Sequence, residues 1–343
     1  MTAQEYLENR IKNCTKYALT EKDRQYIKNE SIEEYILRVL TRKKFRKWKL
    51  DDDVRQAMKE VISKNVKEST PIQLVFPFGG YKLWRIPSAP EVDWAEFFVI
   101  AHCLEYISPI LPAYKAGVMF YYSSDDIIVE KMDNIPTVDT DRYFNSFKIL
   151  LKNFQKYFPK NLGMDIKRIA DFYPNKNKFL QELDEMVKKT EEVFKTMDKS
   201  KIREKVKSSK LNFQFDGAED LTGLSEEGKR NKINFGPILH DAYCKMTDRR
   251  LFIRGGDRIV IFTTQIPNAI TIGTTKSSIA KFWTGFGVLE EKGDSFSDRI
   301  LSPRQLEQSK KQEYRLGKMD LISLQNFKEI RVFAKGFDFV NKK

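Results

Sequence analysis

Apolar side chains recur at a helical spacing in the first part of the chain. Five of them follow an i, i+3, i+4, i+7, i+8 pattern and so mark one helix face: Ile32, Tyr35, Ile36, Val39 and Leu40. Ser31 precedes this face as a candidate N-cap, and a second helix is expected from the acidic residues 51–53 to about Val66. Residues 1–68 are therefore predicted to form a helical N-terminal region.

The pattern changes at Pro71, where short apolar runs begin to alternate with longer amphipathic stretches. Strands are expected at 72–76, 117–122 and 164–169, with helices over about 94–107 and 143–157 between them. Helices of this length are crossovers that make neighbouring strands parallel. Residues 69–210 are thus predicted to form a Rossmann-like α/β core, and 176–210 to form one long charged helix.

Residues 211–343 read as a β-rich C-terminal part. From about residue 235 the sequence shows short apolar runs at 251–254, 258–262, 269–272 and 282–289, separated by Gly, Pro and Asn. We interpret them as an antiparallel extension or a second β layer, which either completes the core or forms a second lobe. The predicted fold class is α/β, with a Rossmann-like, mostly parallel sheet.

Composition narrows the class of protein. The chain has 343 residues, and no apolar run approaches the ~20 residues that a membrane span needs. Its three cysteines have neither metal-binding nor redox spacing, which favours a reduced compartment. We expect a cytoplasmic protein without a membrane partner. The sequence leaves its oligomeric state open.

The net charge of +13 raises the question of a polyanionic partner. The densest basic run is 38–49, which contains no acidic residue and is interleaved with Phe45 and Trp48. Residues 143–210 are also strongly basic. Cations for phosphates and rings for bases are what a nucleic-acid contact uses, whereas a solvated helix face is the simpler interpretation of the same run. Nucleic-acid binding therefore stands as the alternative function.

Nucleotide-cofactor and metal motifs are absent from the sequence. There is neither a Walker A motif nor G-x-G-x-x-G, and two histidines with no His/Cys cluster make a zinc site improbable. We therefore predict no cofactor and no metal. Of the two histidines, His240 is the one whose role the sequence leaves open, either catalytic or structural. The adjacent Asp241 is too close in sequence to be assumed the residue that orients its side chain.

Sites in parallel sheets lie beyond the carboxyl ends of the strands, which selects two loops. The first holds two glycines that let backbone approach a ligand and a lysine that can bind a phosphate or form an imine: Gly79, Gly80, Tyr81 and Lys82. The second offers carboxylates that can anchor an amine or act as base: Ser123, Ser124, Asp125 and Asp126. The competing interpretation of the lysine is a solvated loop charge, and that of the aspartates is ordinary turn chemistry with an N-cap. Arg254 and Arg258 are either an anion site or surface residues.

Four segments carry a resemblance to a known family. They are Val75-Phe76-Pro77-Phe78, Pro90-Glu91-Val92-Asp93-Trp94-Ala95-Glu96, Ala113-Tyr114-Lys115-Ala116-Gly117-Val118 and Ser123-Ser124-Asp125-Asp126. In order and spacing they resemble the pyoverdine/dityrosine biosynthesis family, which includes the isocyanide synthases. The chain departs from that family at Gly79 and Gly80, where lysine and serine are frequent, and at 258–264, which contains no histidine.

The resemblance implies a Rossmann-like enzyme that uses neither metal nor nucleotide cofactor. In that family the amine of an amino acid condenses with a ketose phosphate, and fragmentation leaves an isonitrile. Such a reaction needs an acid/base group and groups that bind the phosphate and the carboxylate. By loop position, Lys82 and Arg254 are candidates for anion binding and Asp125 for base or amine anchor. A non-catalytic scaffold is a third possibility.

Overall fold

The structure is a computed structural model that describes residues 1–42, 50–78, 91–124, 126–133, 135–172, 175–211, 214–215, 218–219, 225–227, 236–250, 258–262, 270–271, 285–317, 329–334 and 336–338. Four helices open the chain: α1 (Ala3–Asn13), α2 (Glu21–Asn29), α3 (Ile32–Leu40) and α4 (Asp52–Glu68). The Ser31 hydroxyl accepts a hydrogen bond from the N–H of Glu34 at 3.2 Å, which confirms the predicted cap of α3.

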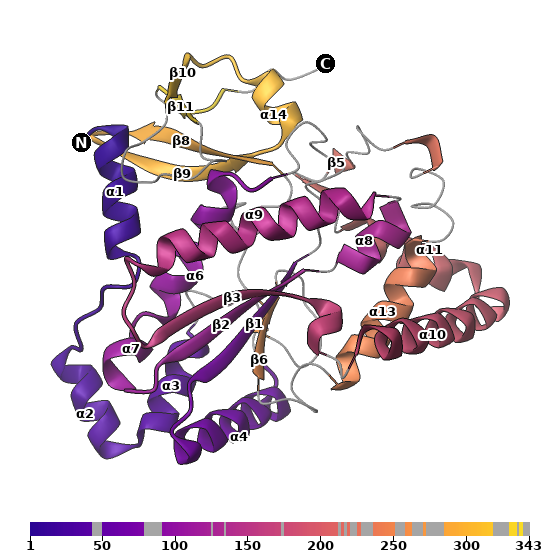
Figure 1. Cartoon of the computed structure of the whole chain (residues 1–343), viewed down its shortest axis with the longest axis horizontal. Coiled ribbons are helices and arrows are strands. Elements are labelled where there is room, and N and C mark those ends of the chain that lie inside the picture. The colour runs from indigo at the N-terminus through magenta and orange to yellow at the C-terminus, as the bar shows by residue number, and fades with distance from the viewer. Residues whose placement is uncertain are drawn as a thin grey trace.

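A parallel sheet forms the centre of the molecule (Figure 1). Its strands lie in the order β3-β2-β1-β6-β7, and every neighbouring pair is parallel. The strands are β1 (Ile72–Phe78), β2 (Val118–Ser124), β3 (Leu162–Arg168), β6 (Arg258–Phe262) and β7 (Ile270–Thr271). The three strands predicted before residue 170 are confirmed. The Rossmann-like α/β fold class is confirmed with them.

Helices connect these strands as crossovers. Between β1 and β2 lie α6 (Trp94–Ile107) and the short α7 (Ile110–Ala113); between β2 and β3 lie α8 (Asp126–Asp133) and α9 (Thr137–Gln155). Aromatic rings fill the space between helices and sheet: Phe97 of α6 stacks on Phe154 of α9 at 4.4 Å between ring centroids, and Phe147 lies 5.2 Å from Tyr122. All four side chains are buried, so this layer fixes α6 and α9 on the sheet.

The long helix expected at 176–210 is two helices, α10 (Lys176–Thr196) and α11 (Lys199–Leu211). The Asp198 carboxylate accepts the backbone N–H of Ser200 at 2.7 Å, which begins a new helix where the sequence pattern suggested continuity. A short 3-10 turn, η1 (Ile169–Phe172), precedes α10. The prediction of a single helix was wrong because Asp198 was not recognised as a cap.

The β-rich interpretation of the C-terminal part needs two corrections. Residues 236–250 form a helix, α13 (Gly236–Arg250). Its buried apolar residues follow the helical period in the sequence itself: Leu239, Ala242, Tyr243 and Met246. In addition, β6 and β7 are parallel members of the central sheet and do not belong to an antiparallel extension. The buried run Ile259, Val260 and Ile261 is typical of a strand covered on both faces.

A second, mixed sheet contains β8 (Phe286–Lys292), β9 (Ser295–Leu301), β10 (Glu313–Leu316) and β11 (Ile330–Phe333) in the order β10-β11-β8-β9. The predicted second β layer is thus confirmed for the strand at 286–292. Figure 1 shows this sheet beside α1, with α14 (Pro303–Gln308) at its edge. The structure also has a short antiparallel pair, β4 (Gln214–Phe215) and β5 (Ala218–Glu219).

Close backbone packing joins the second sheet to the α/β core. The N–H of Gly287 in β8 donates to the Asp93 carboxylate at 3.3 Å, and a Cβ at Gly287 would lie 2.3 Å from the backbone nitrogen of Ala95. The Tyr6 hydroxyl of α1 donates to the carboxylate of Asp298 in β9. Within the described ranges, no helix is long and apolar enough to span a membrane.

Candidate active site

The carboxyl ends of β2 and β3 lie side by side. Ser123 and Ser124 end β2, and their partners in the parallel register are Lys167 and Arg168, the last two residues of β3. Both serines are buried, and within the described part of the chain the hydroxyl of Ser123 has no hydrogen-bond partner. The strands therefore bring two hydroxyls and two cations to the edge of the sheet where parallel α/β proteins bind ligands.

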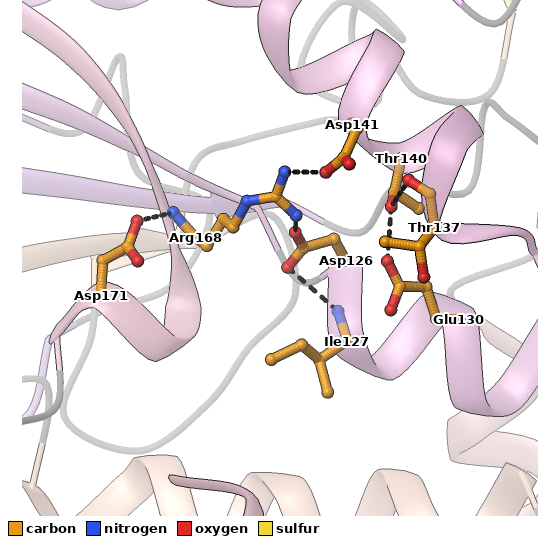
Figure 2. Close-up of polar contacts among 8 residues, drawn as sticks. All are labelled: Asp126, Ile127, Glu130, Thr137, Thr140, Asp141, Arg168 and Asp171. Atoms are coloured by element: carbon orange, nitrogen blue, oxygen red, sulfur yellow. Dashed lines mark hydrogen bonds and ion pairs between the residues drawn. The ribbon is translucent and has the colours of Figure 1, made fainter. Parts of the chain in front are cut away.

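Asp126 is the first residue of α8 and lies directly beyond this edge. Its side chain is 2% exposed, forms an ion pair with Arg168, and accepts the backbone N–H of Ile127 at 3.0 Å (Figure 2). Burial raises the pKa of the Asp126 carboxyl to about 6, against the opposing effect of Arg168 and of the Ile127 N–H. The neighbouring Glu130 carboxylate contributes to the rise. The carboxyl therefore exchanges a proton close to neutral pH.

Arg168 lies between two carboxylates. Figure 2 shows its guanidinium between Asp126 and Asp141, and both contacts are ion pairs. The guanidinium also lies 4.6 Å from the ring centroid of Phe144, while the backbone N–H of Arg168 donates to Asp171 at 2.8 Å. Contacts from α9 thus fix the side chain that faces Asp126, and η1 fixes the backbone of Arg168.

This arrangement suits proton transfer. A carboxyl with a pKa near 6 is present in both protonation states around neutral pH, which is the condition for a general acid or base. The Arg168 guanidinium stabilises the ionised form of Asp126 without being able to take up the proton itself. Of the adjacent pair that the sequence offered, Asp126 is the described residue.

His240 lies on α13, a helix that packs against α8, the helix that begins with Asp126. The side chain of His240 is half-buried. The carboxylate of the adjacent Asp241 forms ion pairs with Lys205 of α11 and, at 2.8 Å, with Lys245. Asp241 thus serves to join α11 to α13, and the catalytic role of His240 stays a prediction.

The backbone of Arg258 lies away from the carboxyl edge of the sheet. It begins β6 and pairs with Gln73 near the start of β1, so its backbone is at the amino end of the sheet. Its guanidinium carbon nevertheless lies 4.9 Å from the ring centroid of Phe172, the last residue of η1. Six other predicted site residues fall outside the described residues: Gly79, Gly80, Tyr81, Lys82, Asp125 and Arg254.

Sequence reasoning missed three charged residues here, namely Lys167, Arg168 and Asp141. The rule that sites follow the carboxyl ends of strands was applied to the first two strands and not to the third, whose last residues are Lys167 and Arg168. Asp141 carries no such signal, since its helix position alone does not indicate a contact. Among the described residues, no group of three or more His, Cys, Asp and Glu side chains is arranged to hold a metal ion.

Comparison with known proteins finds a similar solved structure but no matching family or curated protein. No protein-family model matches the chain, and no curated protein matches it. Among solved structures, the PvcA protein from Pseudomonas aeruginosa is similar over 88% of this chain and 100% of its own, with a TM-score of 0.55 and 13% sequence identity. At that identity the likeness is one of fold: this chain is folded like PvcA.

Proposed function

We propose that this protein is an isocyanide-synthase-like enzyme that condenses the amine of an amino acid with the carbonyl of a ketose phosphate. The observation that carries the proposal is the environment of Asp126. A buried carboxyl with a pKa of about 6 at the carboxyl edge of a parallel sheet is typical of an acid/base group in an α/β enzyme.

Condensation of an amine with a ketone needs a group that both accepts and donates protons. The attacking ammonium group must lose protons to become a nucleophile, and the hydroxyl of the addition product must gain one to leave as water. Asp126 can act at either point because its two protonation states coexist near neutral pH. We assign it the role of general acid/base, with Arg168 as the residue that positions it.

Two further observations support the proposal. The motifs between residues 75 and 126 resemble the pyoverdine/dityrosine biosynthesis family, which predicts a Rossmann-like fold for this chain. The structure has that fold and shares it with PvcA over most of the chain. The predicted roles of Lys82 in anion binding and of Asp125 as base or amine anchor belong to this proposal, and with Asp126 as the acid/base group we assign Asp125 the second of these roles.

A ligand and product screen tests the proposal. The protein is incubated with aromatic and aliphatic amino acids, each with and without a ketopentose phosphate, and mass spectrometry follows loss of the amine and formation of an isonitrile. We expect an isonitrile only where both substrates are present and Asp126 is intact. Lys82→Ala and Asp125→Ala are expected to abolish turnover while leaving the melting temperature nearly unchanged. An inactive wild-type protein with every pair would contradict the proposal.

A further inference from the structure

Two cations contact the same aromatic ring beside the central sheet, outside the Asp126 ion pair. The Lys167 ammonium lies 4.6 Å from the ring centroid of Tyr121 and 5.7 Å from that of Phe172. The guanidinium of Arg258 lies 4.9 Å from the same Phe172 ring, and the Tyr121 and Phe172 rings are 6.1 Å apart. All four side chains are half-buried. One ring thus brings together cations from two strands that are not neighbours.

These two positive charges have no acidic partner among the described residues. Lys167 and Arg258 form none of the ion pairs that join lysines and arginines to carboxylates elsewhere in the described ranges. Asp165, the acidic residue in register with Tyr121, accepts the backbone N–H of Ile166 at 2.8 Å. Two like charges near one ring repel each other, and an anion bound by both would offset this electrostatic repulsion.

Unsatisfied donors lie at the same place. The Nε of Arg258 and the hydroxyl of Ser123 are buried and have no hydrogen-bond partner among the residues that the structure describes. Ser123 is the register partner of Lys167, and it shares a strand face with Tyr121 because side chains two positions apart point the same way. A buried donor without an acceptor is costly, so native proteins usually satisfy it. An oxygen-rich ligand would supply the acceptors.

We propose that Lys167 and Arg258, together with the Ser123 hydroxyl, bind the phosphate group of a sugar phosphate. The identity of that ligand rests on the proposed function, whereas the anion site rests on the contacts themselves. A phosphate monoester carries up to two negative charges and accepts several hydrogen bonds, which matches two cations and a hydroxyl. Arginine offers a planar set of donors and lysine a point charge.

The position of Arg258 is consistent with this role. Its backbone begins β6 at the amino end of the sheet, yet its side chain reaches the ring of Phe172, in the turn that follows β3. Lys167, by contrast, starts from the carboxyl end. The two side chains therefore approach Phe172 from different levels of the sheet. A phosphate bound by both would lie beside Phe172, the ring that both cations contact.

Calorimetric titration tests the anion site directly. Wild-type protein, K167M and R258M are titrated with a ketopentose phosphate, the unphosphorylated ketopentose and inorganic phosphate. The control is K156M, because the Lys156 ammonium lies 5.1 Å from the Tyr157 ring in another part of the chain and has the same kind of contact. We expect the sugar phosphate to bind roughly tenfold more weakly or worse to K167M and R258M. Its affinity for K156M should be unchanged, and K167R, which keeps the charge, should retain most of it.

The outcomes separate this inference from the proposed function. If inorganic phosphate binds in a way that depends on Lys167 and Arg258 but no sugar phosphate does, the anion site stands and the proposed substrate fails. Equal affinity of all variants for the sugar phosphate would overturn the site. So would a wild-type protein that binds no phosphate compound, or one that binds only polynucleotides. Melting temperatures near that of the wild-type protein show that each variant is folded.

Discussion

The guanidinium of Arg168 at the end of β3 forms an ion pair with the carboxylate of Asp126 at the start of α8. The two residues are 42 positions apart, and the parallel pairing of β2 with β3 brings them together. Burial nevertheless outweighs the attraction, since the pKa of Asp126 is raised to about 6. The Arg168–Asp126 ion pair therefore serves mainly to hold a titratable carboxyl in place, and contributes less to the stability of the fold.

The first prediction concerns the pH dependence of stability. Because the Asp126 carboxyl has a higher pKa in the folded than in the unfolded protein, the folded state binds more protons between about pH 4 and pH 6. The free energy of unfolding should fall as pH rises through that window, by about 2 kcal/mol between pH 4.5 and pH 7.5. Urea unfolding of the wild-type protein and D126N at pH 4.5 and pH 7.5 measures the difference. D141N, which removes the other carboxylate from Arg168, should keep this pH dependence. If the free energy of unfolding changed with pH in the same way in the wild-type protein and in D126N, the raised pKa of Asp126 would be contradicted.

The second prediction concerns removal of the cation. R168M leaves the buried Asp126 carboxylate without its ion pair, so it should lower the free energy of unfolding by about 3 kcal/mol at pH 8. At pH 5 the loss should shrink, because Asp126 is then protonated in the folded protein. R142M is the control: Arg142 pairs with Glu91 at 2.8 Å on the surface, where a pair contributes about 1 kcal/mol or less. An equal loss at both pH values would mean that packing, and not charge, explains the effect.

The third prediction tests the contact between the two sheets. A Cβ at Gly287 would lie 2.3 Å from the backbone nitrogen of Ala95, so G287A must displace β8 from α6. We expect a loss of about 2 kcal/mol in the free energy of unfolding. At Gly317 a Cβ would meet no atom of the described residues within 4 Å, which makes G317A the matched control. Equal stability of the two variants would show that β8 can shift at no cost.

Several predictions from the sequence were right because they depend on local patterns. The face that includes Ile36 and Val39 marked α3, and the apolar runs after Pro71 marked the strands of the central sheet. The helical period at Leu239 and Met246 was also present in the sequence, but the strand-like runs that follow it dominated the interpretation of that region. The local pattern of apolar residues is therefore a sufficient guide to these elements when every segment is compared with both the helical and the strand period.

Other features could not be predicted, because they depend on pairing between distant segments. Whether β6 lies parallel to β1 or in an antiparallel layer is decided by tertiary contacts and not by its own residues. In the same way, the contacts of Arg168 with Asp126 and Asp141 follow from the register of β3 and the placement of α9. The candidate site was thus located by the rule for strand ends, and its charged network required the structure.

The fourth prediction concerns nucleic acid, the alternative function suggested by the basic run at 38–49. Within the described part of that run, the Arg38 guanidinium lies 4.4 Å from the ring centroid of Tyr26. In the basic segment 143–210, Lys195 and Lys205 form ion pairs with acidic residues. We expect short RNA and DNA to give no thermal shift at moderate salt. Tight binding that weakens by roughly one log unit per phosphate for each tenfold rise in salt would favour the alternative.

The most direct test of the central claim is the rate at which wild-type protein and D126N form an isonitrile from an amino acid and a ketose phosphate, measured from pH 5 to pH 9. We expect a wild-type rate that changes with an apparent pKa near 6, and a rate for D126N reduced by roughly a hundredfold or more at every pH. An active D126N with an unchanged pH profile would show that another group carries out the proton transfer and would contradict the proposed role of Asp126.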